Sequence, residues 1–493
     1  MEGVKLCRQF LAAFLIYLCT INLGSVAAPS KIQAVSYLRK YGYIDSSTSG
    51  GSLVGEETVS NAVKDFQRFA GLSTTGNLDD ATLNMMEKPR CGVRDKSGST
   101  ASKRKKRYAI QGSRWHMNNL NYRISKYPRK IRDRALVDNE IARALQAWSD
   151  VTNIKFFNNE KEDVTHVDIR FEHGDHGDGS PFEGRGHTLA HAFFPHCGSD
   201  AHFDDDEEWT INEDNGTNLF QVVVHEIGHS LGLDHSDVED SVMTPFYEGY
   251  VPQKTLDRDD IESVQILYGR PNRAPPVINR NPARLTPDPN GPNICKNPTL
   301  DAATIVDDGR AFFFKGDYYW EIQESGIVNG PRKISDDWDG MPGNIDAAMT
   351  WSNGKTYFFK NDMYYRFKNQ DMDSGFPKPM HVEFPGIPSN VNAAFVWGGN
   401  GRLYFFKDDL YWRFDNCKNP PVVTSTNTRN PYFYPIHIHN WKGLPTHIDA
   451  ALTWDNQKTY FFKGDEYYRF NDGANVVDAR SPTKRYWLHC QEE

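Results

Sequence analysis

One sequence pattern occurs four times in the last part of the chain. Each copy begins with a small tripeptide and continues through an aromatic strand, a turn and a second aromatic strand. The tripeptides are Asp301-Ala302-Ala303, Asp346-Ala347-Ala348, Asn392-Ala393-Ala394 and Asp449-Ala450-Ala451. Repeats of a strand unit at this period indicate a four-bladed β-propeller, because such a unit buries its apolar face only against its neighbours.

Two features of the repeat concern how the ring is built. Cys295 and Cys490 bracket the four copies, and a disulfide between them would tie the first blade to the last. The alanines favour tight packing near the axis, while the alternative is that backbone carbonyls there line an ion channel. The predicted propeller covers residues 295–490, and the Pro- and Asn-rich segment 271–294 is interpreted as a linker.

The chain begins with a pattern typical of a secretory signal peptide. Lys5 and Arg8 precede an apolar run from Phe10 to Cys19, and small residues follow. The run is too short to span a bilayer comfortably, and no later stretch is long and apolar enough to do so. Residues 1–28 are therefore predicted to direct secretion to the extracellular space. The alternative is an N-terminal membrane anchor.

Residues 29–107 are predicted to form a helical pro-domain, since apolar residues such as Val59 and Phe66 recur at helical spacing. Its basic end contains Arg107, preceded by Lys106 and Arg104. Furin-like proprotein convertases cut this arrangement, and the cut would make Tyr108 the new N-terminus.

The alternative for this basic run is a solvated linker or a nucleic-acid patch. The net charge of -9 gives no reason to expect a nucleic-acid partner.

Residues 108–270 mix helix and strand patterns. The apolar residues between Ile141 and Trp148 have helical spacing, and those between Val167 and Phe171 alternate with polar ones. A mixed twisted sheet with helices is expected here.

The segment from His225 to His235 carries the chemistry. His225 and His229 are four residues apart, so on a helix they project from one face, one turn apart. Gly232 permits the turn that would bring His235 back as a third ligand. Three protein ligands leave a fourth position open, which is typical of catalytic zinc.

Glu226 lies beside these ligands. Zinc lowers the pKa of bound water to about 7 and polarises a carbonyl group. Glu226 would take a proton from the attacking water and deliver it to the leaving amine. The eleven-residue pattern is the metzincin signature, so the sequence predicts a zinc-dependent endopeptidase on an α/β metzincin fold.

With these motifs the chain resembles a secreted matrix metalloproteinase with a hemopexin-like C-terminal domain, over nearly the whole mature chain. The resemblance implies that Met243 forms the Met-turn beneath the zinc. It also implies that Pro245 and Tyr247 form one wall of the pocket for the residue after the scissile bond. Gln221 would lie at the base of that pocket.

The sequence around Cys91 resembles the cysteine switch of the same family. There the pro-segment thiolate occupies the fourth zinc position until cleavage, here after Arg107, releases it. The family has Pro where this chain has Arg94, which predicts a less rigid loop and an intact switch. A disulfide from Cys91 is the alternative. By the same resemblance, the new N-terminus at Tyr108 would pair with Asp259.

The resemblance also implies metal sites away from the catalytic centre. Three imidazoles and one carboxylate suit a closed structural zinc site, and they are His176, Asp178, His191 and His202. Oxygen ligands suit calcium, and the matching residues are Glu183, Gly184, Gly186, Thr188, Asp204 and Glu207.

A further calcium site of the family is poorly matched. Its Gly-rich loop is replaced by the shorter segment 195–200, its upstream Asp position carries His166, and only Asp200 is retained. Cys197 in this loop is unexpected. It would pair with Cys417 across two domains, or either thiol would bond another chain.

The resemblance implies extracellular matrix and other extracellular proteins as substrates and tissue inhibitors of metalloproteinases as partners. One alternative is a non-catalytic protein that binds through its propeller, which would be expected to have lost Glu226 or a zinc ligand. Another is a different hydrolase on the same zinc core. Asn215 begins an acceptor sequence for N-glycosylation.

Overall fold

A computed structural model of the 493-residue chain describes residues 31–45, 54–96, 109–161, 164–271, 287–415, 417, 421–422 and 434–490. It divides into two compact units, Met1–Lys88 with Arg94–Thr100, and Pro89–Val93 with Ala101–Glu493. The expected signal peptide and the expected cleavage site at Arg107 and Tyr108 lie outside the described residues.

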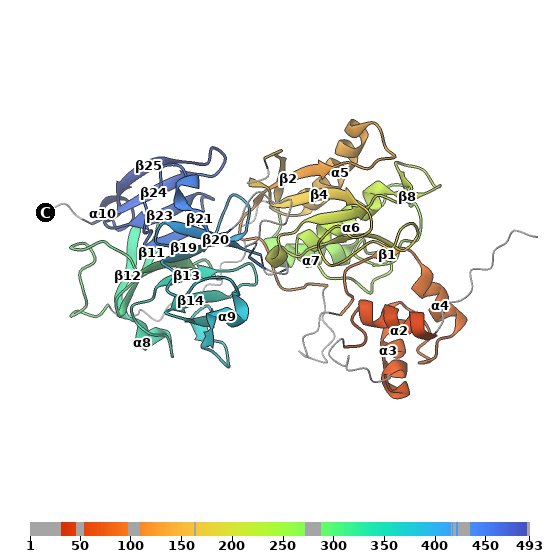
Figure 1. Cartoon of the computed structure of the whole chain (residues 1–493), viewed down its shortest axis with the longest axis horizontal. Coiled ribbons are helices and arrows are strands. Elements are labelled where there is room, and N and C mark those ends of the chain that lie inside the picture. The colour runs from red at the N-terminus through yellow and green to blue at the C-terminus, as the bar shows by residue number, and fades with distance from the viewer. Residues whose placement is uncertain are drawn as a thin grey trace, which may run out of the picture. The chain divides into compact units, whose positions relative to one another are not determined.

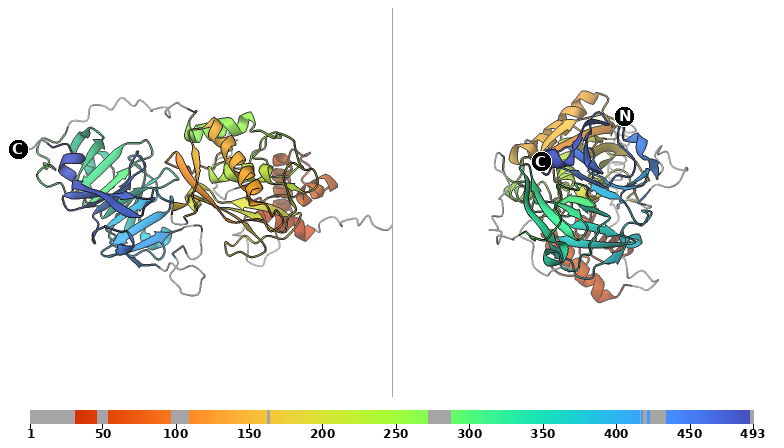
Figure 2. Two further views of the ribbon diagram at one scale, coloured as in Figure 1. Left: turned by 90° about the horizontal axis from the view of Figure 1, so that it is seen from above. Right: turned by 90° about the vertical axis from the view of Figure 1, so that its left-hand side faces the viewer.

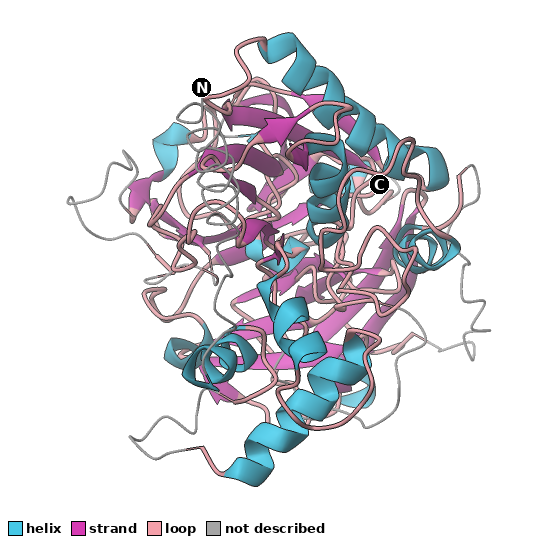
Figure 3. Ribbon diagram, turned by 90° about the vertical axis from the view of Figure 1, so that its right-hand side faces the viewer, coloured by secondary structure: helices cyan, strands magenta, loops and turns pink. Residues whose placement is uncertain are grey.

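The described part of the first unit is helical (Figure 1; cyan in Figure 3). Its helices are α2 (Lys31–Lys40), α3 (Glu56–Phe69) and α4 (Asp80–Glu87). Val59, Val63 and Phe66 are buried on one face of α3, as their spacing predicts. The Asp79 side chain caps α4 by accepting from the Thr82 amide.

The second unit begins with a six-stranded mixed sheet in the order β1-β5-β6-β4-β2-β3. Its strands are β1 (Arg90–Cys91), β2 (Asn119–Lys126), β3 (Lys155–Asn158), β4 (Val167–Glu172), β5 (Thr188–Ala192) and β6 (Ala201–Asp204). Only β5 and β6 pair antiparallel within this sheet. Val167, Ile169 and Phe171 are buried and alternate with half-buried residues, as expected for a strand. A short ladder joins β7 (Trp209–Thr210) and β8 (Thr217–Asn218).

Three helices accompany this sheet: α5 (Arg134–Val151), α6 (Leu219–Ser230) and α7 (Arg258–Tyr268). Ile141, Leu145 and Trp148 are buried on one face of α5. The Trp148 indole Nε1 donates to the Val224 carbonyl at 3.0 Å, which fixes α5 against the centre of α6. The apolar core therefore surrounds the helix that carries His225 and His229.

Four antiparallel sheets follow (green to blue in Figures 1 and 2). The first two contain β9 (Ala302–Ile305), β10 (Ala311–Lys315), β11 (Tyr318–Gln323) and β12 (Gly326–Lys333), then β13 (Ala347–Thr350), β14 (Thr356–Lys360), β15 (Met363–Lys368), β16 (Asp371–Met372) and β17 (Lys378–Pro379). The last two contain β18 (Ala393–Val396), β19 (Leu403–Lys407), β20 (Leu410–Phe414) and β21 (Ile436–His437), then β22 (Ala450–Thr453), β23 (Thr459–Lys463), β24 (Glu466–Asn471) and β25 (Val476–Pro482). Short helices α8 (Ile334–Asp337), α9 (Met380–Glu383) and α10 (Thr483–Tyr486) flank them.

The innermost strands β9, β13, β18 and β22 contact one another in a closed ring. The repeated alanines lie on these strands and are buried. The acidic or amide residue before each alanine pair has a structural use, because Asp301 and Asp449, for example, accept from the turn amides of Gly316 and Gly464. The predicted fold class, a helical segment, an α/β metzincin sheet and a four-bladed propeller, is confirmed.

A disulfide joins Cys295 to Cys490, the pair that brackets the repeats. The last residues of the segment interpreted as a linker pack on the first blade. Ile294 is buried there, and Gly291 lies so close to Pro331 that a Cβ would be 2.6 Å from its ring. This end of the segment is packed because Ile294 buries an apolar side chain and because Gly291, which has no side chain, lets the backbone approach Pro331.

Candidate metal centre

Helix α6 presents two imidazoles to one point. Its first turn is capped by the Asn218 side chain, which accepts from the Gln221 amide at 3.1 Å. His225 and His229 are buried, and their Nε2 atoms are 3.1 Å apart. Each Nδ1 faces a backbone carbonyl, Val242 at 2.7 Å and Leu233 at 2.8 Å. The Nδ1 atoms therefore carry the protons, and two bare Nε2 atoms face each other, as in ligands that share a cation.

The chain turns sharply after α6. Gly232 has φ +97°, and a Cβ there would lie 2.1 Å from the Ser113 carbonyl oxygen, so only glycine fits. Beyond this turn, His235 returns towards the ring of His229, with the two ring centres 4.7 Å apart.

The side chains of Cys91, His225, His229 and His235 form a buried group whose ligand atoms all lie within 4.8 Å of one another. The Cys91 Sγ is 3.5 Å from His229 Nε2. Nitrogen ligands at the usual zinc distance in a tetrahedron are about 3.3 Å apart. The donor set and its spacing fit zinc.

Cys91 reaches this group on a short extended segment. The Cys91 amide donates to the Pro245 carbonyl at 2.9 Å, and the Gly92 amide donates to Ala190 at 2.8 Å. On the same side as Pro245, the Tyr247 amide donates to the Pro89 carbonyl at 2.9 Å. The segment is thus bonded to β5 on one side and to the loop 245–247 on the other, in the manner of a peptide added to a sheet edge.

Glu226 is fully buried beside Cys91, and burial raises its pKa to about 8. The Cys91 thiol and the Ala192 amide lie close enough to lower this pKa part of the way back, yet neither makes a hydrogen bond of normal geometry with the carboxyl group. Burial, together with the neighbouring Glu226 charge, also raises the pKa of the Cys91 thiol well above its usual range. Two buried acidic groups side by side disfavour each other's charge, and a cation bound beside them would remove that cost.

Met243 lies directly under α6. A Cβ on Gly228 would be 2.2 Å from the Met243 sulfur, so any larger residue at this point of α6 would have to displace the Met243 side chain. The turn that carries Met243 is held by the buried Asp260 carboxylate, which accepts from the Val242 and Asp257 amides. Sequence reasoning missed Asp260, although its place in an acidic helix N-terminus was a signal for a cap.

A second group brings together residues that are distant in sequence. One oxygen of Asp178 faces His176 Nε2 at 2.8 Å, His191 Nε2 at 2.8 Å and His202 Nδ1 at 2.7 Å. Burial raises the pKa of Asp178, but hydrogen bonds from the three imidazoles hold it well below its usual range. A closed set of three nitrogens and one oxygen fits structural zinc.

Comparison with known proteins adds independent evidence. Residues 114–269 match the matrixin peptidase family, and residues 30–86 match a family described as a putative peptidoglycan binding domain. Hemopexin repeats match 300–343, 345–389, 391–446 and 448–490. Matrix metalloproteinase-19 of Mus musculus is 33% identical over 98% of this chain and 89% of that relative. The chain belongs to the matrix metalloproteinase family.

Other relatives share less of their length. Stromelysin-2 of Rattus norvegicus is 34% identical over 86% of this chain and 76% of its own. Matrix metalloproteinase-15 of Homo sapiens is 32% identical over 68% of this chain, which spans only 59% of that relative. Membership makes this metalloproteinase a zinc metalloendopeptidase of an extracellular family. In the described part of the chain, no helix has the length and apolar character to cross a membrane.

Gln221 and Tyr247, two of the residues expected to line the substrate pocket, make hydrogen bonds on either side of one loop. The Gln221 Nε2 donates to the Gly249 carbonyl at 3.1 Å, and its Oε1 accepts from the Val251 amide at 2.7 Å. The Tyr247 hydroxyl accepts from the Asn218 amide at 2.8 Å. Gln221 therefore fixes the loop that follows Tyr247, and both ends of its amide are used.

The acidic residues expected at calcium are close to one another but do not form as tight a group as the two histidine clusters. Burial, with the neighbouring charges of Asp206, Glu207 and Glu183, raises the pKa of Asp204 to about 6. One Asp204 oxygen is buried with no hydrogen-bond partner among the described residues. The Glu207 carboxylate accepts from the Gly186 amide at 2.5 Å. A buried acidic site of this kind fits a hard cation.

The positions of Asn215 and Asp259, two further residues of the sequence analysis, differ in exposure. Asn215 is exposed in the loop before β8. The Asp259 carboxylate accepts from the hydroxyl of Ser236, the residue after His235, at 2.7 Å.

Proposed function

We propose that the chain is a secreted zymogen of an endopeptidase that cleaves extracellular matrix and other extracellular proteins, collagen among them. His225, His229 and His235 hold the catalytic zinc, and Cys91 is its fourth ligand until cleavage after Arg107. The observation that carries the proposal is the position of Cys91, whose sulfur lies 3.5 Å from His229 Nε2 on a segment bonded to β5 on one side and to the loop 245–247 on the other.

The mechanism follows from the surroundings of Glu226. Zinc, when bound, supplies a Lewis acid that polarises the scissile carbonyl. Once Cys91 has left, Glu226 is the buried base that takes the proton of the attacking water and gives it to the leaving amine. The strand positions of Pro89–Gly92 are then free for substrate, with Pro245, Tyr247 and Gln221 around the residue after the scissile bond.

The remaining assignments belong to the same proposal. His176, Asp178, His191 and His202 hold structural zinc, and the loop from Glu183 to Thr188 holds calcium with Asp204 and Glu207. Residues 1–28 direct secretion, 29–107 form the pro-domain, 108–270 the catalytic domain and 295–490 the propeller. A furin-like convertase activates the enzyme, tissue inhibitors of metalloproteinases block it, and Asn215 is glycosylated.

Cleavage of a broad peptide library by convertase-processed protein tests the mechanism. The Glu226→Ala variant should lose about 10²–10⁴-fold in kcat/KM while keeping its zinc, because general acid–base catalysis contributes on that scale. Glu262→Ala is the matched control, since Glu262 pairs with Arg258 on the outside of α7. Equal cleavage by wild type and Glu226→Ala would overturn the mechanism, and an absence of cleavage by either protein would favour a protein that acts by binding alone.

A further inference from the structure

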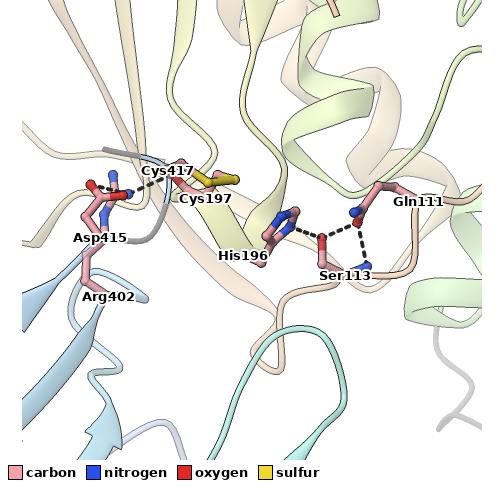
Figure 4. The surroundings of a disulfide bond; sticks show 7 residues. All are labelled: Gln111, Ser113, His196, Cys197, Arg402, Asp415 and Cys417. Carbon is pink, nitrogen blue, oxygen red and sulfur yellow. Dashed lines mark hydrogen bonds and ion pairs between the residues drawn. A yellow bond between two sulfur atoms is a disulfide. The ribbon is translucent and has the colours of Figure 1, made fainter. Parts of the chain in front are cut away.

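A disulfide joins the catalytic sheet to the third blade of the propeller (Figure 4). Cys197 lies in the loop between β5 and β6, and Cys417 follows β20, 220 residues later in the sequence. Their Cα atoms are 5.2 Å apart, within the usual range for a disulfide.

An arginine from the same blade enters the loop beside this bond. The Arg402 Nη2 contacts both carboxylate oxygens of Asp200, at 3.1 and 3.2 Å, and its Nη1 donates to the Cys197 carbonyl at 3.1 Å. A Cβ on Gly198 would lie 1.2 Å from Nη1, so the guanidinium occupies the space that a side chain would fill. Asp415 adds a second carboxylate at 3.7 Å.

The fit is reciprocal. A Cβ on Gly401, next to Arg402, would lie 2.1 Å from the ring of Trp115 in the catalytic part. His166 Nε2 faces the Gly398 carbonyl at 3.1 Å, while its Nδ1 accepts from the Asn121 amide at 2.8 Å. Each side therefore inserts one large side chain over a glycine of the other.

The junction continues to the zinc-motif helix. Ser199 and Ser230 exchange hydrogen bonds between their hydroxyls and carbonyls, at 2.9 and 2.8 Å. The Trp115 indole donates to the Ser230 carbonyl at 3.0 Å, and the ring of Phe194 contacts that of His229. Ser230 is the last residue of α6.

The residues here do not fit the further calcium site that the family resemblance suggests. Asp200 is already bonded to a cationic side chain, and His166 uses both ring nitrogens on backbone groups. We infer that Arg402 is an internal cation in place of calcium at Asp200, and that the Cys197–Cys417 disulfide makes the third blade a fixed part of the catalytic unit.

Non-reducing peptide mapping with a zinc count tests the covalent part. The expected result is a linked peptide pair containing Cys197 and Cys417, with two zinc ions per chain. The alternative to the disulfide is a metal held by His196, Cys197 and Cys417, since His196 lies beside the two sulfurs. The Nδ1 atom of His196 faces the Ser113 hydroxyl. Free thiols, links to another chain, or a third zinc that is lost on cysteine alkylation would overturn the inference.

Differential scanning calorimetry of the full chain tests the rigid junction, with all proteins carrying Glu226→Ala to prevent self-cleavage. The catalytic and propeller parts should unfold in one transition, and Cys197→Ser/Cys417→Ser should separate them into two. Arg402→Gln tests the junction with the disulfide intact and should lower the transition temperature. Arg332→Gln, which removes an equally buried ion pair with Asp337 inside the first blade, is the control for the number of transitions and should keep one.

Asp200→Asn and the double variant Asp200→Asn/Arg402→Gln complete a thermodynamic cycle. The double variant should lose less transition temperature than the two single losses added together. Additive losses, two transitions in the unaltered chain, or one undivided transition in the folded disulfide variant would contradict the inference. If the disulfide variant does not fold, the cycle alone decides.

Discussion

At the scale of single residues, the space beside β5 accepts only a small residue at position 92, directly after Cys91. Gly92 lies against β5, where a Cβ would meet the Thr188 methyl group at 2.7 Å and the His191 Cβ at 3.3 Å. Neither neighbour is the end of a long flexible side chain. Glycine at position 92 is therefore required by the space available, in addition to matching the family's cysteine switch.

Gly92→Ala should weaken the seating of Cys91 in the uncleaved protein. Overpacking of this kind costs about 1–3 kcal/mol, so peptide cleavage by the uncleaved chain should rise about 5- to 150-fold. Arg107→Ala in the same protein keeps the pro-segment attached during the assay.

Gly55→Ala is the control, because a Cβ there has only the Thr58 hydroxyl nearby, at 4.0 Å. Basal cleavage that is the same for Gly92→Ala and its parent would contradict the account of the seated segment.

At the scale of elements, α6 depends on a turn that is distant in sequence. The Val242 carbonyl that orients His225 belongs to the turn held by Asp260. Asp260 also belongs to the capping box of α7, so one carboxylate joins that helix to the turn beneath the proposed zinc site.

Asp260→Ala should destabilise the folded protein by about 3 kcal/mol, because it leaves buried donors without their acceptor. Affinity for the catalytic zinc should fall about 10–100-fold, which is the usual effect of removing a group that orients a metal ligand. Thermal unfolding and chelator competition measure the two effects. Asp133→Ala, which removes an exposed cap of α5, should cost about 1 kcal/mol and leave zinc affinity unchanged. An Asp260 variant with unaltered zinc affinity would show that the turn does not position His225.

At the scale of the whole molecule, the junction between catalytic sheet and third blade contains a histidine that folds in its neutral form. His166 is 2% exposed, and burial lowers its pKa to about 4, with the nearby Arg402 charge acting in the same direction. An unfolded histidine titrates near 6.5. Below that pH the unfolded chain binds more protons, so the stability contributed by neutral His166 is full above about pH 6.5 and is lost as pH falls towards 4.

Acidification from pH 7.5 to 5 should therefore cost the parent protein about 2 kcal/mol more than it costs His166→Gln, whose side chain does not titrate. Denaturant unfolding at both pH values, in the Glu226→Ala background, measures the difference. Loss of metal at low pH affects both proteins and cancels in the comparison. A parent–variant difference that is independent of pH would mean that the pKa of His166 is the same in the folded and the unfolded chain, and would contradict this account.

The sequence predicted what depends on local spacing. The His225–His229 interval on a helix and the four Asp/Asn-Ala-Ala strands each occur within a few residues, and their periodicity is enough. Resemblance to a family supplied the His176–His202 set, whose members meet only because β5 and β6 pair. Three features depend on how distant elements pack, which local spacing does not predict. They are the Cys197–Cys417 bond, the insertion of Arg402 over Gly198 and the role of Asp260.

The most direct test of the central claim is X-ray absorption at the zinc edge of the full-length Glu226→Ala protein before and after activation. Before cleavage, one of the two proposed zinc ions should have a sulfur ligand at about 2.3 Å, which is half a sulfur per zinc on average. After convertase cleavage and removal of the pro-segment, the sulfur should be gone and the zinc content unchanged. A spectrum without sulfur in the uncleaved chain, or with the same sulfur after activation, would contradict a catalytic zinc closed by Cys91.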